Sequence, residues 1–312
     1  MLVNETIFKE LIKRGYSRKN GTRVWDVSDS KLWYLTPELA KGLLQLKKLE
    51  PYRMNVVERE LDLLKAHAKE IVSKFGFKRF NLINLGCGIG VKAAYFVRSL
   101  PNDVRIRYSP VDISSYFIQK TVERIRGMKS PKVEAVKQFV SDFNDLDDII
   151  GLLRNGVYQR NLILFLGSTI SNFEINDILY MISDAMLPGD TIVIGNGIRK
   201  GPRFVEIEKY KVPLFNDWFI HVMKGLGFKE NEVEYNARFA YGRVEGYYTI
   251  KMDKTVDYRN RKVKFKKGDE IVVAIQYKHY DHELKKFCQM YFSKVEMYKD
   301  KDGEYCLIVC VK

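Results

Sequence analysis

A short turn with a glycine at every second position constrains this chain more than any other feature. The turn follows the apolar run 80–85, FNLINL, and precedes a segment whose apolar residues have helical spacing. Because glycine has no Cβ and adopts positive φ readily, such a strand, turn and helix bring bare backbone close to a ligand. A second apolar run, 104–111, ends in Asp112, and a carboxylate there can accept hydrogen bonds from both hydroxyls of a ribose. These features predict a nucleotide-type site at the carboxyl ends of adjacent parallel strands.

The spacing of the glycines indicates which nucleotide is bound. A dinucleotide site usually reads G-x-G-x-x-G and places a pyrophosphate at the helix N-terminus, whereas this turn reads G-x-G-x-G and has no basic residue before Lys92. The pattern resembles the S-adenosylmethionine (SAM) site of class I methyltransferases, although Asn84 stands where that family usually has an acid. The resemblance implies SAM as the cofactor, with its ribose at Asp112. The turn residues expected to bind it are Gly86, Cys87, Gly88 and Gly90.

Strict alternation of strand and helix patterns from Phe80 to Lys200 predicts an α/β fold. Repeated β-α-β units imply a parallel sheet with helices on both faces, and continuous apolar runs such as 162–166 are typical of strands buried on both faces. The predicted strands are 80–85, 104–111, 134–140, 161–166 and 190–195. We therefore expect a doubly wound, Rossmann-like sheet of the class I methyltransferase type.

Asp142 and Phe143 follow the third predicted strand, and two interpretations of them stay open. This position commonly contacts the adenine in such folds, where Asp142 would accept from the exocyclic amine and Phe143 would lie near the ring. Alternatively, Asp142 caps the helix predicted in NDLDDIIGLL, and Phe143 belongs to the core.

The string FLGSTISNF, residues 165–173, is the most specific in the chain. It leaves the carboxyl end of the fourth predicted strand, where loops of such folds carry function, although turn chemistry and a helix N-cap also explain Ser, Thr and Asn there. The string resembles the loop F-L-G-S-T-I-G-N of the ergothioneine-pathway histidine N-methyltransferases. The resemblance implies that Gly167 contacts the cofactor and that Asn172 grips the amino-acid end of the acceptor.

Other segments extend this resemblance over nearly the whole chain. Residues 25–33 read W-D-x-x-x-S-x-L-W where the family has Y-D-x-x-x-S-x-L-F, and LEPYRMNVVERE at 49–60 stands where the family has L-P-E-Y-Y-P-T-R. Phe215-Asn216 opens a predicted helix in the expected place, and KFKKGDEIVVAIQYKH parallels a segment near the family's C-terminus.

The family's substrate domain is discontinuous, and this sequence permits the same layout. Alternation ends at Lys200, and antiparallel-looking strands follow at 229–277. The domains predicted are 1–55, the first part of a substrate domain; 56–200, the SAM-binding domain; 201–278, the inserted part of the substrate domain; and 279–312, a helix and hairpin that complete the SAM-domain sheet.

The departures from the family concern the acceptor. Trp25 replaces a tyrosine beside the substrate amine, and Ala274 and Gln276 replace the glutamate and serine that hold histidine's imidazole; Tyr52 and Asn172 correspond to residues at the amino-acid end. The resemblance thus implies an amino-acid-like acceptor other than free histidine. Trp25 would offer an aromatic face to a developing alkylammonium, or it is an ordinary packing residue.

The composition limits the partners, the metal sites and the cellular location that we expect. The net charge of +14 allows nucleic-acid binding or a lysine-rich solvated surface. Only 259–267, RNRKVKFKK, is densely basic, and it is predicted as one strand of a hairpin that turns at 267–269.

The four scattered cysteines indicate buried thiols, not disulfides. His279 and His282 lack a third metal ligand, so no metal is expected. The chain shows no signal peptide or membrane span, so we expect a cytoplasmic protein with no membrane partner.

The predicted reaction is in-line methyl transfer from SAM to a nucleophile, with nitrogen as the expected acceptor atom. It requires the donor and a neutral amine to be held in line with water excluded. Asn172, Tyr52 and Trp25 are the residues expected around the acceptor. Two alternatives remain: a methyltransferase for a protein side chain or a tRNA that docks on 259–267, and a non-catalytic SAM-binding protein, because Asn84, Trp25 and Asn196 stand where relatives carry more reactive residues.

Overall fold

The computed structural model describes residues 3–46, 48, 50, 53–201 and 206–312. The chain forms two compact units, each built from two segments. The first unit comprises Met1–Leu46 and Gly201–Lys278, and the second comprises Lys47–Lys200 and His279–Lys312. The first boundary thus falls at Leu46, whereas the sequence placed it at residue 55.

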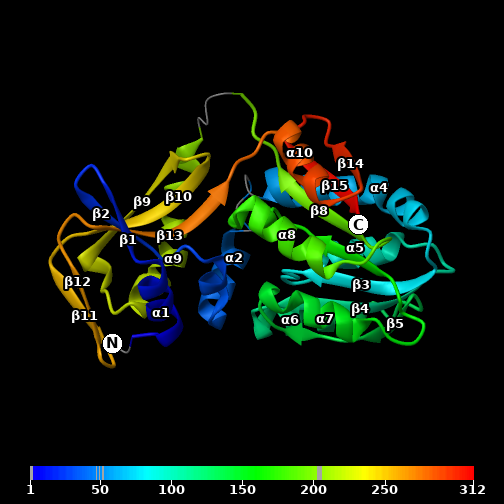
Figure 1. Ribbon diagram of the computed structural model, residues 1–312, viewed down its shortest axis with the longest axis horizontal. Helices are drawn as coiled ribbons and strands as arrows, with labels where there is room; N and C mark the ends of the chain where they lie inside the picture. The colour runs from blue at the N-terminus through cyan, green and yellow to red at the C-terminus, as the bar shows by residue number, and fades with distance from the viewer. Residues whose placement is uncertain (1–2, 47, 49, 51–52, 202–205) are drawn as a thin grey trace. The chain divides into compact units, whose positions relative to one another are not determined.

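The second unit contains an eight-stranded sheet in the order β14-β15-β8-β7-β3-β4-β5, with β6 also paired to β4 (Figure 1). The strands are β3 (Arg79–Leu85), β4 (Arg105–Asp112), β5 (Val133–Val136), β6 (Phe139–Val140), β7 (Asn161–Phe165), β8 (Thr191–Gly197), β14 (Lys294–Lys299) and β15 (Tyr305–Val311). Strands β3 to β8 pair in parallel, and β14 and β15 add an antiparallel edge. The α/β fold predicted from the sequence is confirmed. The third predicted strand differs, because its residues form two short strands, β5 and β6, on the same side of β4.

Helices cover both faces of this sheet, as the β-α alternation requires. The helices of this unit are α4 (Arg59–Phe75), α5 (Val91–Ser99), α6 (Ser115–Gly127), α7 (Leu146–Leu153), α8 (Ile175–Ala185) and α10 (Asp281–Tyr291). Helices α4 and α5 bury their apolar residues with Phe80 and Leu82 of β3, whereas α7, α8 and α10 pack with Ile83 and Leu85. Adjacent strand residues point to opposite faces, so one strand serves both cores.

In the sequence, Thr36 followed by Pro37, and Asn55 with Glu58 three residues later, predict two helix starts. Helix α2 (Pro37–Leu46) begins as expected, with Pro37 at its first position and Thr36 Oγ1 accepting from the N–H of Leu39 at 3.4 Å. The next helix was expected to start at Asn55. Instead, Arg53–Glu58 forms a π-helical segment, η2, and α4 begins at Arg59 and ends before Gly76, which has a φ of +77°.

The first unit contains a five-stranded sheet in the order β1-β2-β13-β10-β9. Its strands are β1 (Tyr16–Lys19), β2 (Thr22–Asp26), β9 (Val233–Ala240), β10 (Arg243–Ile250) and β13 (Glu270–Tyr277), and its helices are α1 (Glu5–Arg14), α2 and α9 (Pro213–Gly225). The two segments of this unit join where β2 pairs in parallel with β13. Arg23 of β2 donates to both carboxylate oxygens of Asp269, just before β13.

The basic run 259–267 forms a hairpin with a different partner from the one predicted. Strand β12 (Arg261–Phe265) pairs with β11 (Lys254–Tyr258) in a separate two-stranded sheet, not with β13. Because Tyr258 pairs with Arg261, the loop holds only two residues, and Arg259 adopts a φ of +52° there. Val263 and Phe265 are buried, while Arg261, Lys262 and Lys264 are exposed.

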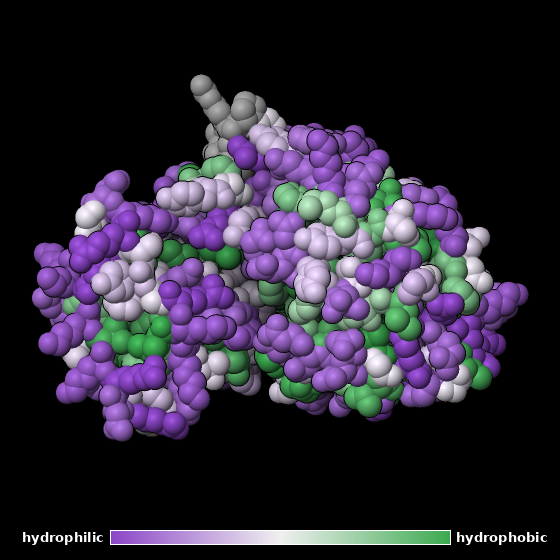
Figure 2. All heavy atoms as spheres, viewed as in Figure 1, coloured by the Kyte–Doolittle hydropathy of each residue, from purple (hydrophilic) through white to green (hydrophobic). Residues whose placement is uncertain are grey.

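The face drawn in Figure 2 is mostly hydrophilic in each unit. Among the described residues, no helix is both long and apolar enough to cross a bilayer. All four cysteines are buried and free.

Candidate cofactor and acceptor sites

The glycine turn between β3 and α5 has the backbone conformation that its sequence predicts. Gly86, Gly88 and Gly90 have φ values of +60°, +52° and +73°, which L side chains rarely adopt. The N–H of Gly86 donates to the carbonyl of Val111 on β4 at 2.9 Å. The turn is thereby fixed to the end of the neighbouring strand.

Helix α6 holds the other side of the turn. Thr121 Oγ1 donates to the carbonyl of Gly88 at 2.9 Å, and Arg124 Nε donates to the carbonyl of Ile89 at 2.8 Å. A Cβ at Gly90 would lie 2.7 Å from Thr121 Oγ1 and 3.2 Å from its Cα. Gly90 is therefore required for close packing of the turn against α6, in addition to its positive φ.

Asp112 lies at the carboxyl end of β4 and is only 6% exposed. Its Oδ2 accepts from the N–H of Gly88 at 3.2 Å, and its Oδ1 accepts from the N–H of Ser114 at 3.0 Å. The carboxylate thus joins the glycine turn to the start of α6. An oxygen of this kind has further lone pairs with which to accept from ligand hydroxyls.

Asn84, before the turn, and Cys87, within it, both have buried side chains. Burial raises the pKa of the Cys87 thiol well above its ordinary value, and the nearby Asp112 carboxylate raises it further. Asn84 donates to the hydroxyl of Tyr108 at 2.8 Å, so the amide that replaces the usual acid is satisfied by the core. Cys87 therefore contributes backbone to the turn, not a reactive thiolate.

Phe143 lies beside the glycine turn. Its Cζ would lie 3.6 Å from a Cβ at Gly86, and its ring packs at 5.7 Å against Phe165 and at 5.8 Å against Phe173. Asp142 accepts from the N–H of Asn144 at 3.1 Å and so caps the short 3-10 helix η3 (Phe143–Asp145). The capping role is present, and the adenine contact stays a prediction.

The loop after β7 is held by a residue that the sequence analysis did not identify. Glu60 of α4 is fully buried, and both of its carboxylate oxygens accept from the N–H of Gly167, at 2.8 and 3.1 Å. Gly167 has a φ of +79°, and Ser168 follows in the left-handed region at +57°. Gly167 therefore suits its backbone conformation, whereas Ser168 adopts a conformation that residues other than glycine rarely take.

Asn172 ends the short 3-10 helix η4 (Thr169–Asn172) and is half-buried. It does not cap the helix that follows. Glu174 is the N-cap of α8, and its side chain accepts from the N–H groups of Asn176 and Asp177. The capping explanation for Asn172 is therefore wrong, and its amide is not needed for α8.

Ala274 and Gln276 lie on β13 in the first unit, on the same face of the sheet. Ala274 pairs with Gly246 of β10. Gln276 Oε1 accepts from the hydroxyl of Tyr210 at 2.8 Å and from Lys278 Nζ at 2.5 Å. The sequence analysis did not identify Tyr210 or Lys278 as partners of this position, because they become neighbours of Gln276 only in the folded sheet and at its strand end.

Trp25 of β2 packs inside the first unit. Its ring lies 4.7 Å from that of Tyr16 and 5.1 Å from that of Phe265, and the indole is 7% exposed. Its Nε1 is buried and has no hydrogen-bond partner among the described residues. These contacts favour the packing interpretation of Trp25. Tyr52, the remaining predicted acceptor residue, lies outside the described residues.

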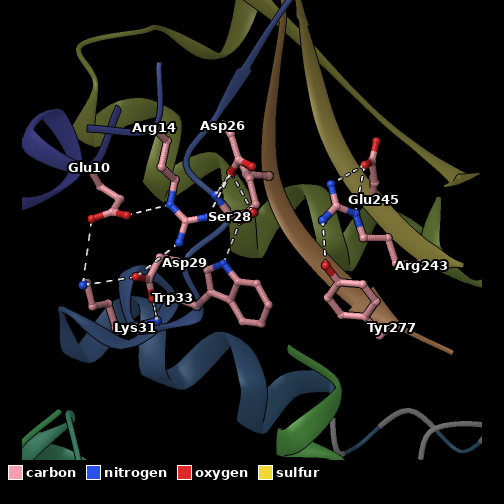
Figure 3. A network of polar contacts seen from close by, with 11 residues as sticks. Glu10, Arg14, Asp26, Ser28, Asp29, Lys31, Trp33, Arg243, Glu245 and Tyr277 are labelled. Atoms are coloured by element: carbon pink, nitrogen blue, oxygen red, sulfur yellow. Dashed lines mark hydrogen bonds and ion pairs between the residues drawn. The ribbon is translucent and has the colours of Figure 1, made fainter. Parts of the chain in front are cut away.

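The W-D-x-x-x-S-x-L-W segment is fixed by polar contacts that Figure 3 shows. Asp26 Oδ1 accepts from the N–H and the hydroxyl of Ser28, at 2.8 and 2.7 Å. Arg14 lies near Asp26 and Asp29 and donates to Glu10. Trp33 Nε1 donates at 2.8 Å to the carbonyl of Val273. The motif thus supports β13, the strand that carries Ala274 and Gln276.

The chain matches the family described as histidine-specific methyltransferase, SAM-dependent, over residues 48–312. It belongs to this family. The protein is accordingly a SAM-dependent methyltransferase, and a search of curated proteins found no further match. The residues of its second unit fit SAM, because positive-φ glycines present bare backbone beside a buried carboxylate and an aromatic ring.

Similar solved structures include several methyltransferases. A SAM-dependent methyltransferase from Clostridium acetobutylicum is 12% identical, with 87% of this chain and 97% of that chain covered and a TM-score of 0.46. The PH0226 protein from Pyrococcus horikoshii is 13% identical, with 89% and 100% covered and a TM-score of 0.47. An amino pentose methyltransferase from Micromonospora echinaspora, solved with SAM bound, is 12% identical, with 89% and 98% covered and a TM-score of 0.43. The sheet topology and the family match establish the fold.

Proposed function

We propose that this methyltransferase methylates a nitrogen of an amino-acid-like acceptor other than free histidine. The observation that carries the proposal is the hydrogen bonding of Gln276, whose Oε1 already accepts from Tyr210 and Lys278. A neutral imidazole presents one N–H donor and one acceptor nitrogen. With Ala274 in place of an acid and the Gln276 oxygen occupied, the imidazole N–H finds no acceptor at these two positions.

In this proposal each part of the chain has a physical task. Bound SAM supplies an electrophilic methyl group on a sulfonium. The glycine turn and Asp112 hold the cofactor, with Asp142 and Phe143 at its adenine end. Asn172 orients the amino-acid end of the acceptor so that its neutral amine lies in line with the methyl group. Of the three residues expected around the acceptor, Asn172 carries the most support, because α8 does not use its side chain.

The test is methyl transfer from labelled SAM to free histidine and to a cell extract fractionated by size. We expect the wild-type protein to label a small-molecule fraction and to use histidine poorly. Ala274→Glu combined with Gln276→Ser should raise histidine turnover about five- to 150-fold, because restoring the one hydrogen bond to the buried imidazole N–H is worth about 1–3 kcal/mol. Thr255→Glu, which adds the same charge on the exposed hairpin, is the matched control. Efficient trimethylation of free histidine by the unaltered protein would refute the proposal.

A macromolecular acceptor is the alternative outcome of the same assay. The exposed residues Arg261, Lys262 and Lys264 of β12 supply a basic surface of the kind that contacts phosphates. Labelling of the RNA or protein fraction instead of the small molecules would favour this alternative. For RNA, methyl transfer should then fall steeply between 50 and 200 mM salt, because phosphate contacts release counterions.

A further inference from the structure

Glu60 places a charged side chain among apolar residues of the second unit. It is fully buried on α4, a helix whose other buried residues are apolar, among them Leu64, Ala68 and Ile71. A charged group in such a place costs several kcal/mol unless it is paired and its lone pairs are satisfied. The contacts of Glu60 meet that requirement, and all of them come from other elements.

Three kinds of donor converge on this carboxylate. The N–H of Gly167 reaches both oxygens, the Tyr305 hydroxyl donates to Oε1 at 2.9 Å, and the Lys92 ammonium pairs with Oε2. Lys92 lies in the first turn of α5, two residues after Gly90. Glu60 therefore contacts both the helix that follows the glycine turn and the loop that follows β7.

A chain of hydroxyls extends from Glu60 to β8. The N–H of Gly197 donates to Ser168 Oγ at 3.1 Å, and Ser168 Oγ donates to the Tyr305 hydroxyl at 3.3 Å, which in turn donates to Glu60. A Cβ at Gly195 would overlap Glu60 Oε1. Glu60 thus occupies a space that only a glycine on β8 leaves open.

We propose that Glu60 is a positioning residue that couples the start of α5 to the loop Gly167–Asn172. The bidentate acceptance fixes the N–H of Gly167 and, through it, the left-handed turn at Ser168 that leads to Asn172. The ion pair fixes Lys92 at the end of the glycine turn. A change at the glycine turn on cofactor binding is transmitted through this carboxylate to the loop after β7.

The negative charge of Glu60 is essential for this coupling. A glutamine at position 60 keeps the shape of the side chain and one acceptor oxygen. Its NH2 group is a donor in place of one acceptor oxygen and the side chain is neutral, so the ion pair with Lys92 and the two-oxygen acceptance from Gly167 are both lost. Glu60→Gln therefore breaks the link between the two elements with little change in packing.

The experiment measures amide hydrogen exchange in residues 166–173 with and without S-adenosylhomocysteine. In the wild-type protein we expect this cofactor product to slow exchange in the loop. In Glu60→Gln the slowing should be about five- to tenfold smaller, a typical range for coupling between sites. Glu70→Gln, which changes an exposed glutamate of the same helix, should leave the slowing unchanged.

This readout separates coupling from stability. A residue with only a structural role would change exchange equally in the free and bound protein, so the ratio of the two rates would stay constant. An unchanged ratio in Glu60→Gln, or no slowing in the wild-type loop, would overturn the proposal. Neither result bears on the acceptor, since no acceptor is present in the measurement.

A second variant tests the proposal without altering the carboxylate. Gly195→Ala places a methyl group against Glu60 Oε1 and should reduce the slowing as Glu60→Gln does. Gly151→Ala in α7 is its control, because a Cβ there meets nothing within 4 Å. If Gly195→Ala leaves the ratio at the wild-type value while Glu60 remains in place, Glu60 does not position the loop.

Discussion

At the scale of single residues, Asp112 has two roles: it is the acceptor expected for the ribose, and it accepts from the N–H of Gly88. Asp112→Ala removes both roles. We expect S-adenosylhomocysteine binding to weaken by about 1.5–3 kcal/mol, the value of a hydrogen bond to a charged group, as measured by calorimetry. Asp147→Ala, an exposed acid on α7, should leave the affinity unchanged.

Asp112→Asn distinguishes the two roles. Asparagine keeps one oxygen that can accept from the turn, so the glycine turn should retain its conformation while the ribose loses its charged partner. An affinity for S-adenosylhomocysteine equal to that of the wild-type protein in Asp112→Ala would show that the ribose is held elsewhere.

Some residues of the candidate sites were predictable from the sequence, and others were not. Gly86, Gly88 and Asp112 were predictable because a turn that needs positive φ, followed by an acid at a strand end, leaves a local pattern. The partners of Gln276 and Glu60 depend on which elements fold against each other. A signal for Glu60 was nevertheless present, since it occupies a position of the apolar stripe of α4, four residues before Leu64.

At the scale of elements, a buried polar network ties the amino ends of the parallel strands. Asp190, which is fully buried just before β8, accepts from the N–H of Asn161 at 3.0 Å and from that of Leu187 at 3.1 Å. It also pairs with Arg154 after α7. This one carboxylate therefore holds β7, β8 and the end of α7 together.

Asp190→Ala should lower the free energy of unfolding by about 3–5 kcal/mol, because it leaves a guanidinium and two N–H groups without a buried partner. The measurement is urea unfolding followed by circular dichroism. Asp184→Ala, an exposed acid on α8, should change stability by less than about 0.5 kcal/mol. A loss as small in Asp190→Ala would mean that water replaces the carboxylate.

The errors in the predicted strands and in their pairing have one physical cause. The predicted strand 134–140 divides into β5 and β6, and β12 pairs with β11 instead of β13. Apolar alternation fixes the face of a strand but not its partner, which depends on the turn that closes first. The parallel strands were predictable to within one or two residues because burial on both faces gives a continuous apolar run.

At the scale of the whole molecule, the family match confirms the SAM-dependent methyltransferase expected from the sequence. The end of β-α alternation at Lys200 predicted an insertion, and the two compact units of the structure meet in the chain at Lys200 and at Lys278. The assignment of the first unit to acceptor recognition remains a prediction. It rests on the resemblance at Ala274 and Gln276.

Removal of residues 1–46 tests that assignment. The deletion removes β1, β2, α1 and α2. It also removes the pairing of β2 with β13, the ion pair from Arg23 to Asp269 and the hydrogen bond from Trp33 to Val273.

The second unit keeps all eight strands of its sheet. We therefore expect S-adenosylhomocysteine affinity to stay within about threefold of the wild-type value, about 0.7 kcal/mol at 1.4 kcal/mol per tenfold. Residues 206–278 should become sensitive to protease and methyl transfer from labelled SAM should be lost, because β13 loses β2, one of its two neighbouring strands, and the segment loses part of its core. A truncated protein that methylates its acceptor at the normal rate would show that the first unit does not recognise the acceptor.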